Sequence, residues 1–197
     1  MTLMIATPTF SYLTPDEYLK LEQDSPIKHE YRNGEAYAMA GASDAHVTIT
    51  LNLASLLRTH VRGTGCRTYV ADMKARIETL NIYYYPDVMV TCDERDRATP
   101  LSKRYPCLIV EVLSDSTEAF DRGDKFADYQ SLESLQEYVL ISQRRKRIDC
   151  FRRNADGHWV LYSFHESDTL HFTSLDFSCT VAEIYEDVEF EAVQAST

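Results

Sequence analysis

The chain has little of what marks a fibrous, disordered or membrane-spanning protein. Its 197 residues include six glycines and six prolines, which excludes a collagen-like or low-complexity chain. No run of about 18 apolar residues occurs, and the first ten residues lack the basic segment and long apolar core of a signal peptide. We therefore expect a cytoplasmic protein without a membrane span.

Several sequence motifs are also absent. The five cysteines are odd in number and form no CxxC, so the sequence predicts neither a disulfide framework nor a structural zinc site. Most of them are expected to be buried thiols. No GxSxG, P-loop or GxGxxG occurs, so the sequence does not indicate a serine hydrolase or a nucleotide-binding protein of those classes.

Basic residues are in deficit. Asp and Glu number 31 against 20 Lys and Arg, which gives a formal net charge of −11 and a pI near 4.9. Such a charge opposes binding to nucleic acid and to anionic membranes. The apolar content is nevertheless that of a globular protein, with 44% hydrophobic and 11% aromatic residues. Disorder is therefore excluded as the dominant state. We expect one domain over residues 1–197, with its core over about 12–187.

Local patterns predict an α/β fold. Thr14 and Glu17 form a capping box around Pro15, which predicts a helix to about Asp24. Ser43 begins a second helix, whose apolar residues recur at helical spacing until Gly63. Two further helices are expected over 119–132 and 181–188. Strands are expected over 68–71, 75–78, 87–91, 107–113, 137–141, 147–152 and 159–164, with hairpin turns at Asn33-Gly34 and Asp156-Gly157. The resulting fold class is a mixed central sheet flanked by helices.

Two acidic residues stand in or beside apolar strands. Glu111 interrupts the run Leu108 to Leu113, where a carboxylate is costly unless a metal, a cation or hydrogen bonds compensate it. Asp87 follows Pro86 and opens another strand. The structural alternatives are a buried Glu paired with a basic residue and an Asp that caps a turn. Together, two carboxylates on neighbouring strands suit Mg²⁺, which prefers oxygen ligands.

A third element is the segment from Asp121 to Tyr129. On a helix, Lys125 lies four residues from both Asp121 and Tyr129, so the three share one face. The alternative to a functional role is a solvated ion pair. In the functional interpretation, Lys125 lies beside the two carboxylates, where it orients water and offsets negative charge on a phosphate.

These segments, in this order, resemble the Uma family of restriction endonucleases, which belongs to the PD-(D/E)XK nuclease superfamily. The resemblance rests on Pro86-Asp87, on the strand and turn from Leu108 to Thr117, and on Asp121, Lys125 and Tyr129, and it spans roughly residues 12–187. It implies a restriction-endonuclease-like fold and Mg²⁺-dependent hydrolysis of DNA, with Mn²⁺ as a substitute. It also implies a homodimer.

Residue roles follow from the resemblance. Asp87 and Glu111 would be the metal-binding acids, and the backbone carbonyl of Val112 a further ligand. The superfamily's usual lysine falls at Leu113, so Lys125 takes its place. Glu30 would be the upstream acid, with Glu35 as the alternative. Accessory positions are His46, Asp121 and Tyr129, although a lone histidine on a helix is more often structural or exposed.

DNA contact requires a local positive surface in so acidic a chain. The densest basic run is Arg144, Arg145, Lys146 and Arg147, between two predicted strands. It is the candidate DNA-binding segment, and its alternatives are a solvated turn or a contact with an acidic partner subunit. Two rival functions remain: a catalytically silent or regulatory relative that binds nucleic acid or protein, and a metal-dependent hydrolase of a smaller phosphoester. In every case we expect non-specific DNA affinity to be weak.

Overall fold

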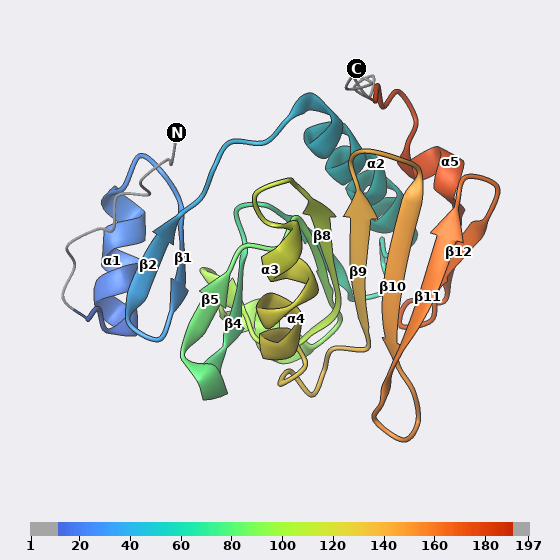
Figure 1. Ribbon diagram of the computed structural model, residues 1–197. Helices are drawn as coiled ribbons and strands as arrows, with labels where there is room; N and C mark the ends of the chain where they lie inside the picture. Colours follow the sequence, from blue (N-terminus) through green and yellow to red (C-terminus); the bar gives the residue numbers. More distant parts are fainter. Residues whose placement is uncertain (1–11, 191–197) are drawn as a thin grey trace, which may run out of the picture.

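The computed structural model describes residues 12–190 (Figure 1). Six strands form the larger sheet in the order β11-β10-β9-β8-β6-β3, and five form a smaller sheet in the order β2-β1-β5-β4-β7. The larger sheet comprises β3 (Arg67–Val70), β6 (Val88–Thr91), β8 (Pro106–Leu113), β9 (Glu137–Ser142), β10 (Arg147–Arg153) and β11 (Trp159–His165). The smaller comprises β1 (His29–Arg32), β2 (Glu35–Ala38), β4 (Lys74–Ile77), β5 (Ile82–Tyr84) and β7 (Ser102–Lys103).

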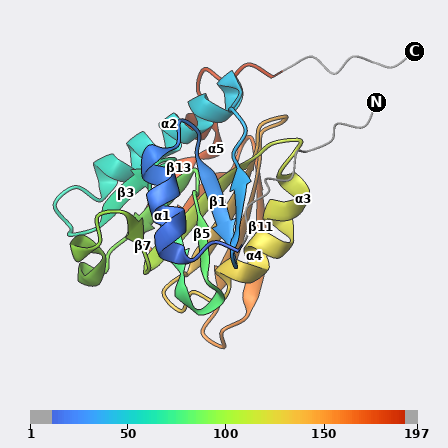
Figure 2. The same cartoon turned by 90° about the vertical axis from the view of Figure 1, so that its left-hand side faces the viewer.

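Helices cover the sheets on different sides. They are α1 (Pro15–Asp24), α2 (Asp44–His60), α3 (Glu118–Arg122), α4 (Asp124–Tyr129) and α5 (Val181–Ile184), and a separate hairpin joins β12 (Thr169–Phe172) to β13 (Phe177–Thr180). In Figure 1, α3 and α4 lie in front of β8. Turned by 90°, the molecule shows α1 against the outer side of the smaller sheet (Figure 2). Over residues 12–190, no helix combines the length and apolar character needed to cross a membrane.

Strand β8 is the centre of the molecule. It pairs antiparallel with β6 and parallel with β9, and both of its faces are buried. Because strand side chains alternate, Leu108, Val110 and Val112 pack into the core under α2, while Ile109 and Leu113 pack toward α4 and the smaller sheet. Glu111 shares the odd-numbered face, so its carboxylate lies between the larger sheet and the elements that cover it.

The chain passes from one sheet to the other beside Asp87. Strand β5 belongs to the smaller sheet, β6 to the larger, and only Tyr85, Pro86 and Asp87 separate them. Val88 pairs with Val110 in the antiparallel register, so the next pair along the ladder is Asp87 and Glu111. Directly opposed residues of an antiparallel pair point to the same face. The register therefore directs both acidic side chains toward the junction between the sheets.

The sequence predictions agree with the fold in class and in several details. Thr14 forms the capping box of α1, and Ser43 caps α2, as predicted. The predicted continuous helix over 119–132 is wrong, because Gly123 lies outside helical geometry and separates α3 from α4. The last helix ends earlier than predicted, at Ile184. Strands β5, β7, β12 and β13 were not predicted, and the sheet is divided in two.

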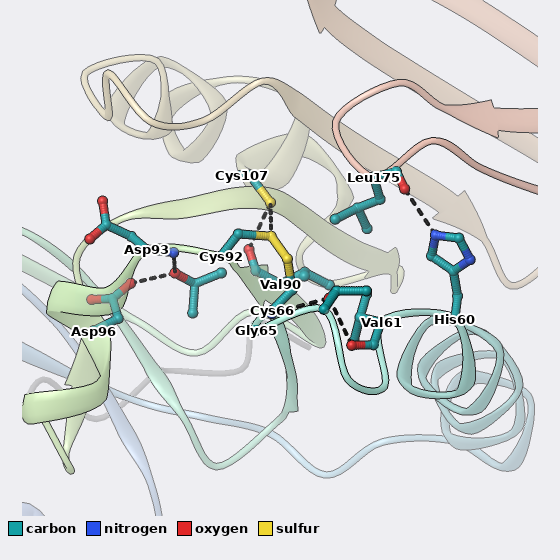
Figure 3. Close-up of a disulfide and its surroundings, with 12 residues drawn as sticks. His60, Val61, Gly65, Cys66, Val90, Cys92, Asp93, Asp96, Cys107 and Leu175 are labelled. Atoms are coloured by element: carbon teal, nitrogen blue, oxygen red, sulfur yellow. Dashed lines mark hydrogen bonds between the residues drawn. A yellow bond between two sulfur atoms is a disulfide. The ribbon is translucent and has the colours of Figure 1, made fainter.

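A disulfide joins Cys66 to Cys92, which corrects the expectation that the chain forms no disulfide (Figure 3). Arg67 on β3 pairs with Thr91 on β6, so the two cysteines lie one position beyond the paired strands. The Sγ of Cys107, on β8, lies 3.9 Å from the Sγ of Cys92. Cys107, Cys150 and Cys179 are free thiols, and the last two are buried as expected.

Candidate functional site

Glu111 and Lys125 form a buried ion pair between β8 and α4. Lys125 Nζ lies 3.0 Å from Glu111 Oε1, and the two residues are only 5% and 3% exposed. The hydroxyl of Tyr129, one helical turn beyond Lys125, donates a hydrogen bond to the same oxygen at 3.1 Å. Among residues 12–190 no hydrogen bond reaches the other oxygen, Glu111 Oε2. That oxygen therefore keeps its lone pairs for a ligand.

Lys125 also forms ion pairs with two further carboxylates. Its Nζ lies 3.0 Å from Glu30 Oε1 on β1 and 3.5 Å from Asp121 Oδ1 on α3. Asp121 stays within reach although Gly123 interrupts the helix between them, because the backbone of α3 leads directly into α4. The lysine thus connects side chains from the smaller sheet, the larger sheet and the helical cover.

Burial is the main cause of the pKa shifts of the acids in this cluster. Burial raises the pKa of Glu111 well above its ordinary range, and the charges of Asp121 and Asp87 add to the shift. Burial likewise raises the pKa of Asp121. For Lys125, burial favours the neutral amine, but the carboxylates outweigh it and raise the pKa well above its ordinary value. The surroundings of Lys125 therefore favour its charged form, whereas burial disfavours the charged forms of Glu111 and Asp121.

Asp87 is held from two sides. Its Oδ1 lies 2.8 Å from Nε2 of His46, in the first turn of α2, and its Oδ2 accepts a 2.7 Å hydrogen bond from the backbone N–H of Val112. Each carboxylate oxygen has a second lone pair, so both remain able to bind a cation. Val112 is thus placed beside Asp87, through its N–H. The loop before α2 is positioned by the Ser43 cap, which accepts from His46 N–H.

Glu30 occupies the outer side of the cluster. Its Oε1 accepts a 3.1 Å hydrogen bond from the N–H of Tyr85, two residues before Asp87. Glu35, the alternative upstream acid, lies elsewhere: it is exposed on β2 and accepts a hydrogen bond from Tyr37. The structure therefore brings Glu30 to Lys125 and leaves Glu35 outside this cluster.

The basic run forms the β9–β10 turn, and most of its charges are paired. Arg144 pairs with Asp115, Lys146 with Glu166, and Arg147 with Asp149 at 3.1 Å. Arg145 is exposed. The turn contacts the residue that caps α2, because Ser43 donates a 2.6 Å hydrogen bond to Gln143 Oε1, and its role in DNA binding stays a prediction.

Three residues that the sequence did not single out fix the position of α4. Asp128 is buried and accepts a 2.6 Å hydrogen bond from the hydroxyl of Tyr84 on β5. Arg32 Nε, on β1, lies 3.3 Å from the same carboxylate. These contacts tie the helix that carries Lys125 to the smaller sheet. The sequence offered one signal for these contacts, namely Asp128 three positions after Lys125. An acidic residue at that spacing is equally typical of a solvated helix surface.

The donor set suits a hard divalent cation. Asp87 and Glu111 offer carboxylate oxygens, and Mg²⁺ usually takes only one or two protein carboxylates, completing its shell with water and phosphate oxygens. Burial is the main cause of the raised pKa of Glu111, and a bound divalent cation would offset that cost by stabilising the carboxylate. Within residues 12–190, no three His, Cys, Asp or Glu side chains cluster as a complete metal centre. Any cation held here would therefore depend on non-protein ligands.

Comparisons with known proteins place the chain in a family. The sequence model of Uma2, described as "Putative restriction endonuclease", matches residues 15–182. Two uncharacterized proteins of Synechocystis sp. are similar: slr1290 is 42% identical over 181 residues, covering 92% of this chain and 95% of the relative. The second, sll1609, is 36% identical over 160 residues, covering 80% and 90%.

A solved structure shares the fold. The crystal structure of a "putative nuclease belonging to DUF820" from Anabaena variabilis has a TM-score of 0.72 to this chain, and the match covers 88% of this chain and 97% of that one. At 15% sequence identity this similarity concerns the fold alone, and it confirms the predicted α/β, nuclease-like architecture. The match of the family model over residues 15–182 shows that the chain belongs to the Uma2 family.

Proposed function

We propose that the protein is an Mg²⁺-dependent endonuclease that hydrolyses DNA phosphodiester bonds with water as the nucleophile. The observation that carries this proposal is the contact of Lys125 with Glu111 and Glu30, beside an Asp87 that is oriented by His46 and Val112. Membership of a family described as restriction endonucleases supports the reaction class. Mn²⁺ is expected to substitute for Mg²⁺.

Asp87 and Glu111 are the residues that would hold the metal ion. When bound, a divalent cation supplies Lewis acidity toward the phosphodiester and lowers the pKa of a coordinated water. His46 and the Val112 N–H keep the Asp87 carboxylate in one orientation, and the register of β6 against β8 directs both acids toward the junction of the two sheets. Tyr129 performs the equivalent task for Glu111. The carbonyl of Val112 is proposed as a further ligand.

Lys125 acts as an electrostatic stabiliser. Because its pKa lies well above the ordinary value, its amine stays protonated and does not act as a general base. A fixed ammonium beside the phosphate stabilises the extra negative charge of the transition state and orients the attacking water. Glu30 and Asp121 hold that ammonium in place through their ion pairs.

A catalytically silent relative is the competing function, and one observation favours it. Lys125 already neutralises part of the charge of Glu111 and Glu30, so the cluster is stable without a metal. Calorimetric titration separates the two: a nuclease binds Mg²⁺ or Mn²⁺ in the wild type and binds it more weakly in Asp87→Ala. Equal heats of metal binding from both proteins would show that Asp87 does not contribute to a metal site.

DNA cleavage tests the activity itself. Purified wild type and Glu111→Gln are incubated with a plasmid in Mg²⁺, and the variant should be slower by at least about 10²-fold, since it loses a charged metal ligand. Glu35→Gln is the matched control, because it makes the same change at an exposed glutamate outside the cluster. It should cut at the wild-type rate.

Two results would contradict the proposal. Equal cleavage by wild type and Glu111→Gln would identify a contaminating nuclease as the source. Cleavage of a nucleotide-sized phosphoester with polymers left intact would favour the smaller-substrate hydrolase. The predicted homodimer, which would supply two cutting centres, is tested separately by sedimentation of the same preparations.

A further inference from the structure

Three cysteines gather at one end of the larger sheet. The disulfide joins Cys66, one residue before β3, to Cys92, one residue after β6. Cys107, the second residue of β8, places its Sγ 3.9 Å from the Sγ of Cys92 (Figure 3). A free thiol and a disulfide therefore lie side by side, at the end of the sheet opposite to the acids of the candidate site.

A bulge in β8 turns Cys107 toward the disulfide. The pairing with β6 shifts by one residue between Val90 and Thr91, which leaves Cys107 as the extra residue on β8. A bulge of this kind re-aims a side chain. Cys107 therefore packs against the core under α2, which Cys66 also contacts, and not on the face of β8 that carries Glu111.

The three sulfur-bearing residues differ in their access to solvent. Cys92 is exposed, whereas Cys66 and Cys107 are half-buried. Exposed disulfides are among the labile ones, and a thiol held beside one attacks it without a bimolecular encounter. Burial raises the pKa of Cys107 to about 11, so a small fraction of this thiol is thiolate at neutral pH and the attack is slow.

We propose that Cys66, Cys92 and Cys107 form a thiol–disulfide exchange site, in which the Cys107 thiolate attacks the Sγ of Cys92 and replaces Cys66 in the disulfide. The Cys92–Cys107 bond forms as the Cys66–Cys92 bond breaks. Cys107 loses its proton to solvent, and the released Cys66 thiolate takes one up. One disulfide is present before and after the step, so it consumes no oxidant or reductant. The exchange does not depend on the proposed nuclease function.

The two crosslinks hold different strands. The Cys66–Cys92 bond ties the edge strand β3 to β6, whereas a Cys92–Cys107 bond ties β6 to β8 and leaves β3 held by its backbone hydrogen bonds. The turn after β3 reaches the candidate site, because the N–H of Ala71 donates to the carbonyl of Asp87 at 3.3 Å. The position of the crosslink therefore sets how firmly β3 is held beside Asp87.

Alkylation tests the proposal by trapping the thiol that the exchange releases. The full chain is purified without reductant, incubated with iodoacetamide, digested without reduction and mapped by mass spectrometry. We expect a fraction of molecules that carry the label on Cys66 together with a Cys92–Cys107 disulfide, and this fraction should grow with time because labelled Cys66 cannot re-form its bond. Label on Cys107 alone, with the Cys66–Cys92 disulfide intact throughout, would overturn the proposal.

Cys107→Ser removes the attacking thiol and should abolish the labelling of Cys66. Cys179→Ser is the matched control, because it makes the same change at a buried free thiol on β13, and it should label Cys66 at the wild-type rate. Tenfold dilution of the wild type should leave that rate unchanged, since the attack is intramolecular. If circular dichroism shows that Cys107→Ser is unfolded, Cys107→Ala takes its place. Labelling of Cys66 that persists in a folded Cys107 variant, or that slows in proportion to dilution, would contradict the exchange.

Discussion

Lys125 Nζ and Glu111 Oε1 lie 3.0 Å apart, in a position where water reaches little of either residue. The pair joins α4 to the central strand and lies within the proposed reaction centre. Burying two charges costs desolvation energy that their attraction repays only with good geometry. Its contribution is therefore measurable in stability as well as in activity.

Removal of one partner should be more harmful than removal of both. Lys125→Met leaves Glu111 without its cation and should lower the free energy of unfolding by about 3–5 kcal/mol, as measured by urea denaturation. Adding Glu111→Gln should recover part of this loss, because glutamine keeps an acceptor for Tyr129. The exposed pair of Lys146 and Glu166 serves as control, and removing it should cost under about 1 kcal/mol. Strictly additive losses at Lys125 and Glu111 would show that the two charges are not coupled.

His46 is expected to act through Asp87. His46→Ala removes the contact to Asp87 Oδ1 and should weaken Mg²⁺ binding by about 10- to 100-fold, the usual effect of losing a group that orients a metal ligand. Calorimetric titration measures the affinity. His60→Ala, on the same helix, is the control, since its ring contacts the carbonyl of Leu175. Equal weakening by both substitutions would assign the effect to α2 as a whole.

Acid stability should depend on Asp149. Burial raises the pKa of this carboxyl, but hydrogen bonds from Ser163, Arg122 and Arg147 outweigh it and hold the pKa below its ordinary value of 3.8. The folded state therefore favours the carboxylate, which contributes stability above pH 3.8 that is lost as the pH falls through the folded pKa. Asp149→Asn should make the free energy of unfolding, measured by urea denaturation, depend less on pH below about pH 4.

The exposed turn residue Asp156 provides the comparison for that experiment. Asp156→Asn should leave the pH dependence of the unfolding free energy unchanged, because the Asp156 carboxylate accepts no hydrogen bond from the described residues. If the unfolding free energy falls equally steeply with decreasing pH in the wild type and in Asp149→Asn, the hydrogen bonds from the paired arginines to Asp149 do not stabilise the folded state.

The Cys66–Cys92 bridge should stabilise the protein under oxidising conditions. The bonded residues are 26 positions apart, and closing a loop of that length contributes about 3–4 kcal/mol in the chain-entropy account. Reduction with dithiothreitol should therefore lower Tm by several degrees, and a Cys66→Ser, Cys92→Ser double variant should be insensitive to the reductant. Cys179→Ser, at a buried free thiol, should still respond. A wild-type Tm that does not change on reduction would contradict this prediction.

The extent to which sequence foretold the structure differs between residues. Glu111 could be predicted because a single acid in an apolar strand is conspicuous, and its contact with Lys125 followed from the order of the motifs. Tyr84 and Asp128 could not, because a tyrosine run and an acid on a helix look the same whether buried or solvated. The disulfide depends on the register of β3 against β6, which the spacing of cysteines does not contain. The roles of the site residues remain predictions.

The division of the molecule into two sheets has a consequence for biosynthesis. Glu111 lies on the larger sheet and Asp87 directly precedes its strand β6, whereas Glu30 reaches the cluster from the smaller sheet. A folding intermediate in which only the larger sheet has formed therefore has both acids but an incomplete set of partners around Lys125. Long-range contacts of this kind form late. The proposed site would therefore be complete only after both sheets have formed and packed against each other.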